Sequence, residues 1–452
     1  MAEKQSKNKW HTPAERIMML GFAAVILLGT ILLCLPVSAA DGKSVYWLDA
    51  LFTATTSVCV TGLVTVPTAT TWSTFGKIVI LGLIQFGGLG IMACLTMVFL
   101  ILRRKISLQS RKLIQDTYNL PVLKGSVGIV RRLLIGTATV EIAGAVLYSF
   151  WFVPEYGFWK GIGYSLFHSV SAFCNAGFDV LADVDAGGSL CRYATDPVVN
   201  FTIMALIIIG GLGFAVWGAI RHHRRFSRLS VYSRLVVIIT TVLIFGGAGV
   251  FAALEWNNPN TIGDLTVPQK LMAALFQSVT LRTAGFATFD QNALSDVSKA
   301  ASDLLMLVGG SSGSTAGGVK TATVGVILLS AWSTARGRTS VHVMKRRIPR
   351  QAVENASALF ILVLLLSGLG AAFLSIADHV SLENALYETI SALCTVGLTT
   401  GITSSLGTAS QIILIVLMFF GRLGIMTISV GFMAANRAEE RVSYAETKIM
   451  IG

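Results

Sequence analysis

The sequence predicts an all-α membrane protein of four fused repeats, each a helix, a pore helix, a filter loop and a second helix, with pseudo-fourfold symmetry around one central pore. Three observations lead to this fold class. Few residues are charged, basic clusters divide the chain into quarters, and two motifs of small residues recur in the same order in each quarter.

The composition is that of a protein dissolved in lipid. Of 452 residues, 54% are hydrophobic and 13% are charged, whereas about 25% of the residues in a soluble domain are charged. Apolar runs of roughly 20 residues recur, which is the length that a helix needs to cross a bilayer. The first run, 17–36, follows basic residues and precedes Ser38-Ala39-Ala40, as in a secretory signal. We interpret it as a membrane helix, because it is long and forms part of the first repeat.

The net charge of +12 comes from basic clusters that alternate with acidic segments. Basic residues gather at 103–132, 221–228 and 336–350, and acidic residues lie at 41–49, 179–196, 255–296 and 378–388. This alternation follows the positive-inside rule, so we expect the basic clusters and both termini in the cytoplasm. It also disfavours binding of nucleic acid, the other function that a strongly basic chain suggests.

Each quarter holds a short semi-polar run between two long apolar segments. The runs align as LFTATTSVCVTGL (51–63), LFHSVSAFCNAGF (166–178), ALFQSVTLRTAGF (274–286) and LYETISALCTVGL (386–398). About ten residues precede the glycine of each run, too few to span a bilayer, so we predict re-entrant pore helices. Four such segments in one chain predict a ring around a water-filled axis, because irregular backbone at membrane depth must be buried in protein or line water.

A second glycine cluster follows each run, within the returning helix. It begins at Gly87, Gly210, Gly309 and Gly421, which follow the first glycines (62, 177, 285 and 397) by 25, 33, 24 and 24 residues. Two markers that recur in order are a strong sign of internal repetition. We therefore divide the chain into repeats 1–105, 106–222, 223–338 and 339–452, the third containing an intramembrane loop at 309–318.

The residues before each first glycine are candidates for a cation filter. Rings of backbone carbonyls replace the water lost by a dehydrated cation, and glycine reaches the backbone angles that aim them. The fourth quarter matches the Thr-Val-Gly core of potassium-channel filters in full, but no quarter carries the Tyr-Gly that follows it there. We expect a shortened filter made of Val60-Thr61-Gly62, Asn175-Ala176-Gly177, Thr283-Ala284-Gly285 and Thr395-Val396-Gly397.

The third quarter expands its second glycine cluster into GGSSGSTAGGVK. A polar loop in mid-membrane must face the pore, so we expect a gate that lies across the axis and withdraws at little cost. Its residues are Gly309, Gly310, Ser311, Ser312, Gly313, Ser314, Thr315, Ala316, Gly317, Gly318 and Lys320. A plain helix kink is the alternative. A phosphate-binding loop is disfavoured, since Val319 stands where that motif has lysine.

Ionisable residues within the apolar segments mark function by default. Arg422 stands where the first two quarters have Gly88 and Gly211, so we expect it beneath the filter as a barrier to cations, with pairing to a buried carbonyl or acid as the alternative. Arg282 is expected to brace the third filter, and Glu388 is a candidate partner for it. We interpret Glu141 as an isolated buried polar contact. The six cysteines show no metal-ligand spacing.

Four helix–pore–helix units with one glycine per filter resemble the Trk/Ktr/HKT superfamily of potassium transporters, and most of all the membrane subunits of bacterial Ktr systems. The resemblance covers nearly the whole chain. It implies K⁺ as the transported ion, Na⁺ as a candidate activator, a location in the bacterial plasma membrane, and an intramembrane loop that gates together with Arg422. Sodium-selective plant relatives have serine at the first filter glycine, so Gly62 favours K⁺.

The same resemblance implies partners for this chain. They are a second copy of the chain, forming a homodimer, and a cytoplasmic KtrA-like ring of RCK subunits that binds ATP and ADP. The apolar end of the tail at 446–452 is either a frayed terminus or a plug that reaches the dimer interface. A secondary cation symporter with alternating access is the alternative function, and no catalytic constellation indicates an enzyme.

Overall fold

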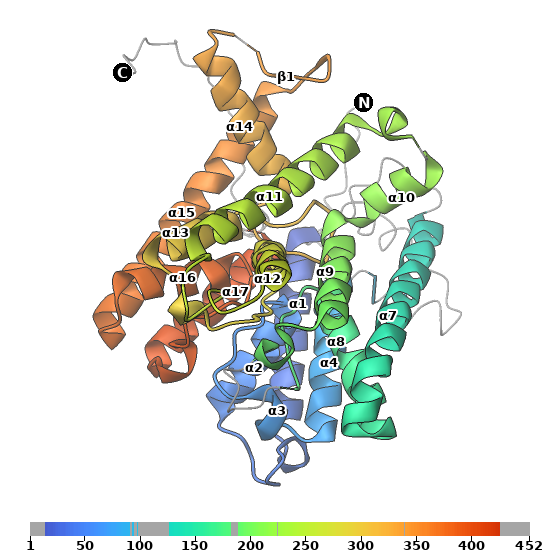
Figure 1. Ribbon diagram of the computed structural model, residues 1–452, viewed down its shortest axis with the longest axis vertical. Coiled ribbons are helices and arrows are strands. Elements are labelled where there is room, and N and C mark those ends of the chain that lie inside the picture. Colours follow the sequence, from blue (N-terminus) through green and yellow to red (C-terminus); the bar gives the residue numbers. More distant parts are fainter. Residues whose placement is uncertain are drawn as a thin grey trace, which may run out of the picture.

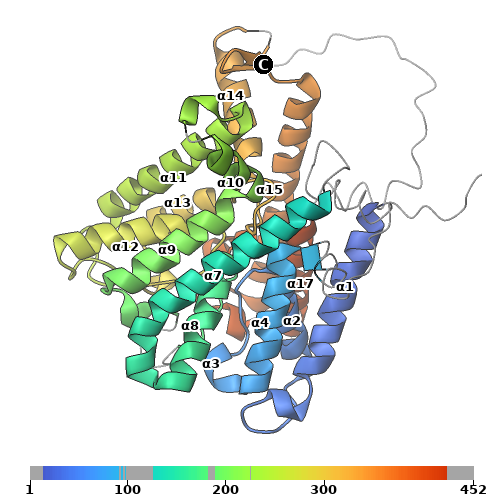
Figure 2. The same cartoon turned by 90° about the vertical axis from the view of Figure 1, so that its right-hand side faces the viewer.

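The computed structural model describes residues 14–90, 93–94, 97, 126–181, 189–223, 225–338 and 340–424. In these residues the fold is helical, with a single short hairpin (Figures 1 and 2). Residues 103–125 of the predicted basic cluster, residues 182–188 of the acidic segment in the second quarter and the tail at 446–452 lie outside the described residues.

Every quarter of the chain contributes one helix that leads to its first glycine and others that flank it. The first two quarters form α1 (Ala14–Leu33), α2 (Trp47–Cys59), α3 (Thr68–Thr71), α4 (Thr74–Leu89), α7 (Ser126–Tyr156), α8 (Phe158–Phe173), α9 (Pro197–Leu212) and α10 (Phe214–His222). The last two form α11 (Val231–Glu255), α12 (Val267–Thr280), α13 (Asp296–Met306), α14 (Thr321–Ala335), α15 (Arg350–Asp378), α16 (Leu382–Leu393) and α17 (Thr408–Leu423). Strands β1 (His342–Val343) and β2 (Arg346–Arg347) join α14 to α15 as an antiparallel hairpin.

Short 3₁₀ helices complete the connections between these elements. They are η1 (Pro36–Ser38), η3 (Cys191–Tyr193), η4 (Phe226–Arg228), η5 (Gln291–Ala293) and η6 (Thr403–Ser405). The helices that lead to the glycines, α2, α8, α12 and α16, have 13, 16, 14 and 12 residues, somewhat more than the ten expected. Polar caps start several helices, as where the Asp196 side chain accepts from the amides of Val198 and Val199 at α9.

Consecutive quarters pack against each other, and the last packs against the first. The contacts between them run through α4 and α8, α9 and α12, α13 and α16, and α17 and α2. The chain therefore closes on itself around a common centre, with α2, α8, α12 and α16 on its inside.

The returning helices differ from the sequence prediction, which placed the second glycine cluster inside a continuous helix. Helices α4, α9 and α17 end at Leu89, Leu212 and Leu423, and the following glycines have positive φ angles (82°, 86° and 86°). After Gly213 the chain turns into α10, bent by 93° from α9. The break is thus not confined to the third quarter, because Gly90, Gly213 and Gly424 all adopt a backbone conformation that other residues avoid.

Glycines in the second cluster let the returning helices approach the pore helices closely. A Cβ atom at Gly87, Gly210 or Gly421 would collide with the carbonyl oxygen of a residue at the end of α2, α8 or α16. These oxygens belong to Val58, Phe173 and Leu393. Small residues commonly allow such contact between membrane helices.

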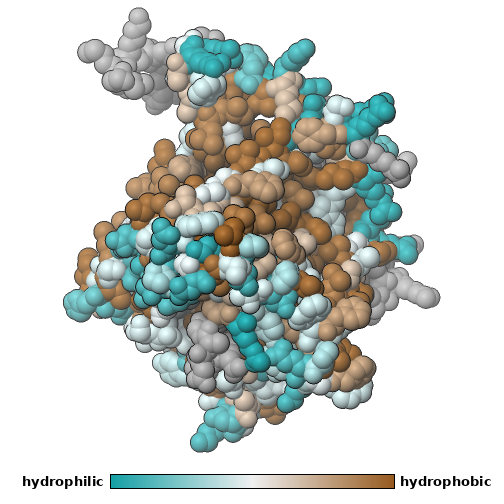
Figure 3. Space-filling model, in the orientation of Figure 1, coloured by the Kyte–Doolittle hydropathy of each residue, from teal (hydrophilic) through white to brown (hydrophobic). Residues whose placement is uncertain are grey.

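The outer surface is apolar over a wide area. Figure 3 shows hydrophobic residues over α11, α14 and α15, with hydrophilic residues gathered toward the two ends of the view. Among the described residues, α7, α11 and α15 are long and apolar enough to cross a membrane, and the bent pair α9 and α10 counts as a further candidate.

Gly210→Ala tests the close approach of α9 to α8. The added methyl group meets the Phe173 carbonyl, so we expect a loss of about 1–3 kcal/mol, the usual result of overpacking. Gly249→Ala is the matched control, because a Cβ there has no neighbour within 4 Å, and alanine is the better helix former by up to about 1 kcal/mol. Thermal unfolding in detergent measures both. A Gly210→Ala protein as stable as the control would contradict the packing described here.

Candidate functional site

The four candidate filter triplets, which we call the glycine segments, share one backbone conformation. The first residue of each has a positive φ angle, 55° at Val60, 58° at Asn175, 65° at Thr283 and 51° at Thr395. The glycines follow with φ angles of 104°, 66°, 79° and 93°. Eight non-glycine residues in the described part of the chain have positive φ, and four of them occupy this one position.

This conformation is strained at three of the four segments. Val60, Thr283 and Thr395 are β-branched, and for such residues a positive φ is a genuine outlier. Each costs about 1–3 kcal/mol and persists only where the surrounding structure enforces it, typically at functional sites. The strain therefore identifies the glycine segments as the first candidate site.

Hydrogen bonds from the pore helices hold the segments in place. The amides of Thr61, Ala176, Ala284 and Val396 donate to carbonyls of α2, α8, α12 and α16 at 2.8–2.9 Å. Amide and carbonyl point in opposite directions across a trans peptide, so the carbonyl of each first residue points away from its pore helix. Hydroxyl groups add further bonds, since Thr56 and Ser391 accept from the amides of Gly62 and Gly397 at 2.9 and 3.0 Å.

The glycine segments also meet one another in a closed cycle. A Cβ atom on Gly62 would lie 2.7 Å from the Ala176 carbonyl oxygen, one on Gly177 2.8 Å from that of Ala284, and one on Gly285 2.5 Å from that of Val396. A Cβ on Gly397 would collide with the Thr61 carbonyl oxygen, which closes the cycle. Each glycine thus lies against a carbonyl oxygen of the next segment, which leaves no room for a side chain, and the four contacts link all four quarters in one closed cycle.

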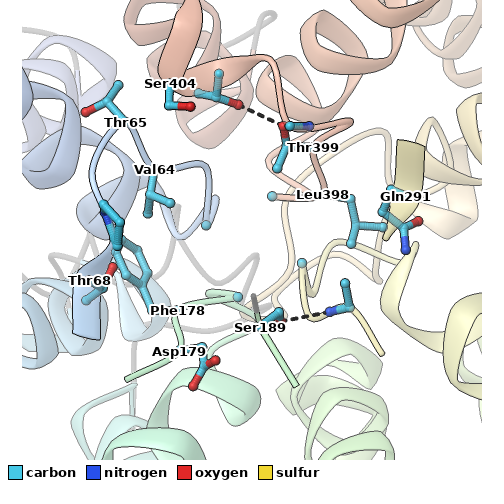
Figure 4. Close-up of a pocket in the computed structure, with 18 of the residues that line it drawn as sticks. Val64, Thr65, Thr68, Phe178, Asp179, Ser189, Gln291, Leu398, Thr399 and Ser404 are labelled. Atoms are coloured by element: carbon cyan, nitrogen blue, oxygen red, sulfur yellow. Dashed lines mark hydrogen bonds between the residues drawn. The ribbon is translucent and has the colours of Figure 1, made fainter. Parts of the chain in front are cut away.

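A cavity of about 330 Å³ opens on one side of the cycle, which we call the cavity end. Figure 4 shows its walls coming from four separate parts of the chain, with Thr65, Asp179, Gln291 and Thr399 among the polar lining residues. On the opposite side, the loop end, the Thr283 and Thr395 hydroxyls and the Asn175 amide oxygen are buried and find no hydrogen-bond partner within the described part of the chain. Unpartnered buried oxygens are costly in a protein interior, so these three oxygens are candidate ligands for a cation.

The glycine-rich loop, residues 309–318, covers the loop end. It is an extended excursion between α13 and α14, closed at its base by a bridge between Val308 and Val319 and by a 2.9 Å bond from the Gly309 amide to the Val319 carbonyl. A plain helix kink is therefore not what the chain forms. At its far side Gly317 lies against Thr395, where a Cβ would collide with the hydroxyl oxygen.

Hydrogen bonds tie the loop to the second quarter at the break between α9 and α10. The Ser311 amide donates to the Gly211 carbonyl at 3.0 Å, and the Phe214 amide donates to the Gly313 carbonyl at 3.0 Å. The Thr315 hydroxyl donates to the Phe173 carbonyl at 3.0 Å. Any withdrawal of the loop would therefore require that these buried hydrogen bonds be exchanged for others.

Arg422 connects the loop to the first and fourth quarters. Its guanidinium donates to the Thr315 carbonyl at 2.5 Å and also to the carbonyls of Gly87 and Gly88. It has no acidic partner among the described residues. Pairing with carbonyls, which the sequence left as an alternative, is confirmed, and it places the positive charge beside the loop.

Two further sequence predictions have definite outcomes. Arg282 is buried behind the third segment and donates to the Thr240 hydroxyl at 3.4 Å. It does not pair with Glu388, whose carboxylate instead accepts from Thr399 and Thr403. Glu141 is a buried polar contact as expected but is not isolated, because Gln85 donates to it at 3.2 Å.

Two contacts that hold the backbone beyond the glycines were not predicted from the sequence. His168 contacts Asp179 at 2.6 Å, and Glu388 accepts from Thr399. Both pairs join the residue nine positions before a first glycine to the residue two positions after it. An alignment of the quarters over these positions would have singled out the second and fourth quarters. The first and third quarters have Thr53 with Val64 and Phe276 with Ala287 there, and none of these residues is ionisable.

Comparison with known proteins gives consistent results. Residues 8–441 match the family model described as TrkH, cation transport protein. The chain is 38% identical to the potassium/sodium uptake protein NtpJ of Enterococcus hirae, with 99% of both chains covered. It is equally 38% identical to the Ktr system potassium uptake protein B of Bacillus subtilis, covering 100% of this chain and 99% of that one.

A solved structure supports the fold. The potassium transporter TrkH from Vibrio parahaemolyticus superposes with a TM-score of 0.73 at 19% identity, covering 94% of this chain and 86% of the other. Together with the apolar helices, these matches define a multi-pass helical membrane protein. The chain therefore belongs to the TrkH family of cation transport proteins, which are membrane transporters and not enzymes.

Proposed function

We propose that this chain is the K⁺-translocating subunit of a Ktr-type uptake system, with four repeats arranged in pseudo-fourfold symmetry around one pore. The cycle of carbonyl oxygens joined by Gly62, Gly177, Gly285 and Gly397 is the observation that carries the proposal. Carbonyl rings of this kind replace the hydration shell of a cation. The names of the relatives from Enterococcus and Bacillus support K⁺ as the ion.

In this proposal the repeats are 1–105, 106–222, 223–338 and 339–452. The filter consists of the glycine segments, and cations enter from the cavity end. Both termini lie in the cytoplasm, which places the cavity outside the cell and the loop on the cytoplasmic side of the filter.

The gate consists of the glycine-rich loop, Lys320 and Arg422. The loop covers the unpartnered oxygens at the loop end, and Arg422 holds it there through the Thr315 carbonyl. A positive charge beside the path raises the energy of a passing cation. The contacts of the loop are those of a closed gate, and opening requires that its hydrogen bonds to α9 and α10 are exchanged.

The proposal extends to the assembly. The Bacillus relative is named as uptake protein B of a Ktr system, which supports a system of several components. We propose a homodimer of this chain beneath a KtrA-like RCK ring that responds to ATP and ADP and docks on the basic cytoplasmic segments. We also propose that Na⁺ activates K⁺ transport by this system.

Gly62→Ser tests the filter and the transported ion together. Gly62 has a φ of 104° and little room for a side chain, so serine distorts the carbonyl ring. We expect purified wild-type protein in liposomes to carry K⁺ in preference to Na⁺, and the variant to lose at least about fivefold in this preference, the factor for ~1 kcal/mol.

Gly42→Ser is the matched control for Gly62→Ser. Gly42 also has a positive φ, 72°, but a Cβ there meets nothing within 4 Å. Equal selectivity in wild type and Gly62→Ser would remove Gly62 from the filter. The proposed pore would be contradicted if neither the wild type nor a protein lacking residues 311–317 carried K⁺ or Na⁺.

Deleting residues 311–317 tests the gate. Removing these residues uncovers the loop end of the glycine segments and releases Arg422, so we expect a folded protein with raised K⁺ flux that no longer depends on cytoplasmic regulation. Flux assays in liposomes, with gel filtration to verify folding, measure this. Unchanged or abolished flux in well-folded protein would argue against a gate.

Phe214→Pro tests the hydrogen bond between α10 and the loop. Phe214 is the first residue of α10, where proline is well tolerated, and its amide is the donor to the Gly313 carbonyl. Losing this bond destabilises the closed loop by about 1 kcal/mol or more, so we expect at least about fivefold higher basal flux. Phe214→Ala is the control, because it also removes the phenyl ring but keeps the backbone amide that donates to Gly313. Equal flux in both variants would show that the bond does not hold the gate.

A further inference from the structure

Two buried glutamine side chains anchor the chain where it leaves the third glycine segment. Gln277 lies on α12 and Gln291 lies on η5, six residues after Gly285. Gln277 Nε2 donates to Gln291 Oε1 at 2.6 Å, and Gln291 Nε2 donates back to Gln277 Oε1 at 3.3 Å. The pair thus joins the helix that leads into the segment to the stretch that follows it, and Gln291 lies in the wall of the cavity (Figure 4).

A tyrosine from the fourth quarter completes the hydrogen bonds of Gln291. Tyr387 lies on α16 and is completely buried, and its hydroxyl donates to Gln291 Oε1 at 3.1 Å. Gln291 Nε2 also donates to the Phe289 carbonyl at 3.1 Å. An amide side chain offers two lone pairs and two donor hydrogens, so the protein uses all four positions of Gln291. Although it lines the cavity, Gln291 therefore keeps no lone pair for a cation, and it acts by holding the backbone.

The third quarter holds this stretch differently from the other three. In those quarters a carboxylate anchors the chain beyond the glycine from within the same quarter, through the pairs Asp49 with Thr65, His168 with Asp179, and Glu388 with Thr399. The third quarter has Phe276 and Ala287 where the second and fourth have such a pair. Its anchor consists of neutral amides instead, and it includes a hydroxyl that a different quarter supplies.

The hydroxyl of Tyr387 is the part of the side chain that packing does not explain. Tyr387 precedes Gly397 by ten residues, and the other quarters have Phe52, Phe167 and Leu275 at the equivalent position. Phe52 and Phe167 are also buried, so an aromatic ring without a hydroxyl fits this place on two of the other pore helices. The hydroxyl is therefore the feature that distinguishes the fourth quarter, and its hydrogen bond reaches the third.

Helix α16 thereby holds two glycine segments at the place where they meet. A Cβ atom on Gly285 would lie 2.5 Å from the Val396 carbonyl oxygen, so the third and fourth segments are in contact. Tyr387 anchors the stretch beyond the third segment, and the next residue, Glu388, accepts from the Thr399 hydroxyl beyond the fourth. A ring of carbonyls discriminates between cations through the size of the ring and the number and field of its ligands, and all of these depend on where the segments are held.

We infer that Tyr387 is a positioning residue that determines ion specificity, because its hydroxyl fixes the third glycine segment against the fourth through Gln291. This inference rests on the proposed function of the glycine segments. Without the hydroxyl, one acceptor position of a buried amide loses its partner, which is costly, and Gln291 and the segment that it anchors rearrange. A less firmly held ring of carbonyls adapts more readily to the smaller Na⁺, so the preference for K⁺ falls.

The experiment compares two substitutions of tyrosine by phenylalanine in the purified full-length protein. Initial rates of K⁺ and Na⁺ uptake into liposomes give the preference for K⁺. In Tyr387→Phe we expect this preference to fall at least about threefold, equivalent to ~0.7 kcal/mol, through faster uptake of Na⁺. General damage to the protein slows both ions instead. Tyr148→Phe is the matched control, because the Tyr148 hydroxyl is also buried but has no hydrogen-bond partner among the described residues, and we expect it to keep the wild-type preference.

Gln277→Met tests whether the effect passes through Gln291. Methionine has a similar unbranched shape but removes the amide that pairs with Gln291, so we expect a loss of K⁺ preference in this variant as well. Residues that share a partner are not additive. The double variant Tyr387→Phe/Gln277→Met is therefore expected to lose no more preference than the more affected single variant.

A Tyr387→Phe protein with the wild-type preference overturns the inference, even if Gln277→Met fails to fold. Equal losses in Tyr387→Phe and Tyr148→Phe also overturn it, because any buried hydroxyl would then have the same effect. Losses that add in the double variant overturn the route through Gln291. All three results leave the proposed function intact, which fails instead if neither wild type nor the protein lacking residues 311–317 carries K⁺ in preference to Na⁺.

Discussion

The structure depends on one constraint, which is that polar backbone inside a membrane must be satisfied by the protein. Helices meet this requirement by themselves, but the glycine segments and the glycine-rich loop do not. Each segment therefore donates a backbone amide to a carbonyl of the helix that leads to it, and the loop donates to α9 and accepts from α10 and Arg422. The surrounding helices thus supply the hydrogen-bond partners that this irregular backbone needs at membrane depth.

The same constraint acts where the glycine segments meet the glycine-rich loop. In the proposed filter, carbonyls that face a cation are not available to the surrounding helices, and the first residue of each segment has a left-handed conformation. On the loop end, the side-chain oxygens of Thr283, Thr395 and Asn175 have no hydrogen-bond partner among the residues that the structure describes, and Gly317 lies directly against Thr395. A segment with side chains could not approach so closely, which explains why glycines concentrate in this part of the chain.

The charged side chains near the glycine segments are also distributed unevenly. Arg282 and Arg422 donate to neutral oxygens. The carboxylates of Asp179 and Asp290 line the cavity beyond the glycines, whereas that of Glu141 is buried on α7 beside Gln85. Along the proposed path from the cavity to the loop, a cation would move from acidic groups toward a guanidinium. This order gives the chain an electrostatic asymmetry that backbone carbonyls alone do not provide.

Local sequence was sufficient for the features that repeat. The helical membrane class follows from apolar run length, and the turns at the first glycines follow from glycine's freedom at positive φ, which Gly62, Gly177, Gly285 and Gly397 all use. The sequence also placed Arg422 and the glycine-rich loop among the functional candidates, because neither belongs in a lipid-facing helix. These properties depend on a residue and its near neighbours.

Only the tertiary structure decided the partners. Arg422 bonds to Gly87, 335 residues away, and Arg282 finds Thr240 where the sequence suggested Glu388. His168 meets Asp179 because the chain reverses at Gly177, and helices α4, α9 and α17 end where an apolar sequence suggested continuation. Each partner depends on which hydrogen-bonding groups remain unsatisfied when the four quarters pack against each other. A local sequence pattern does not contain that information.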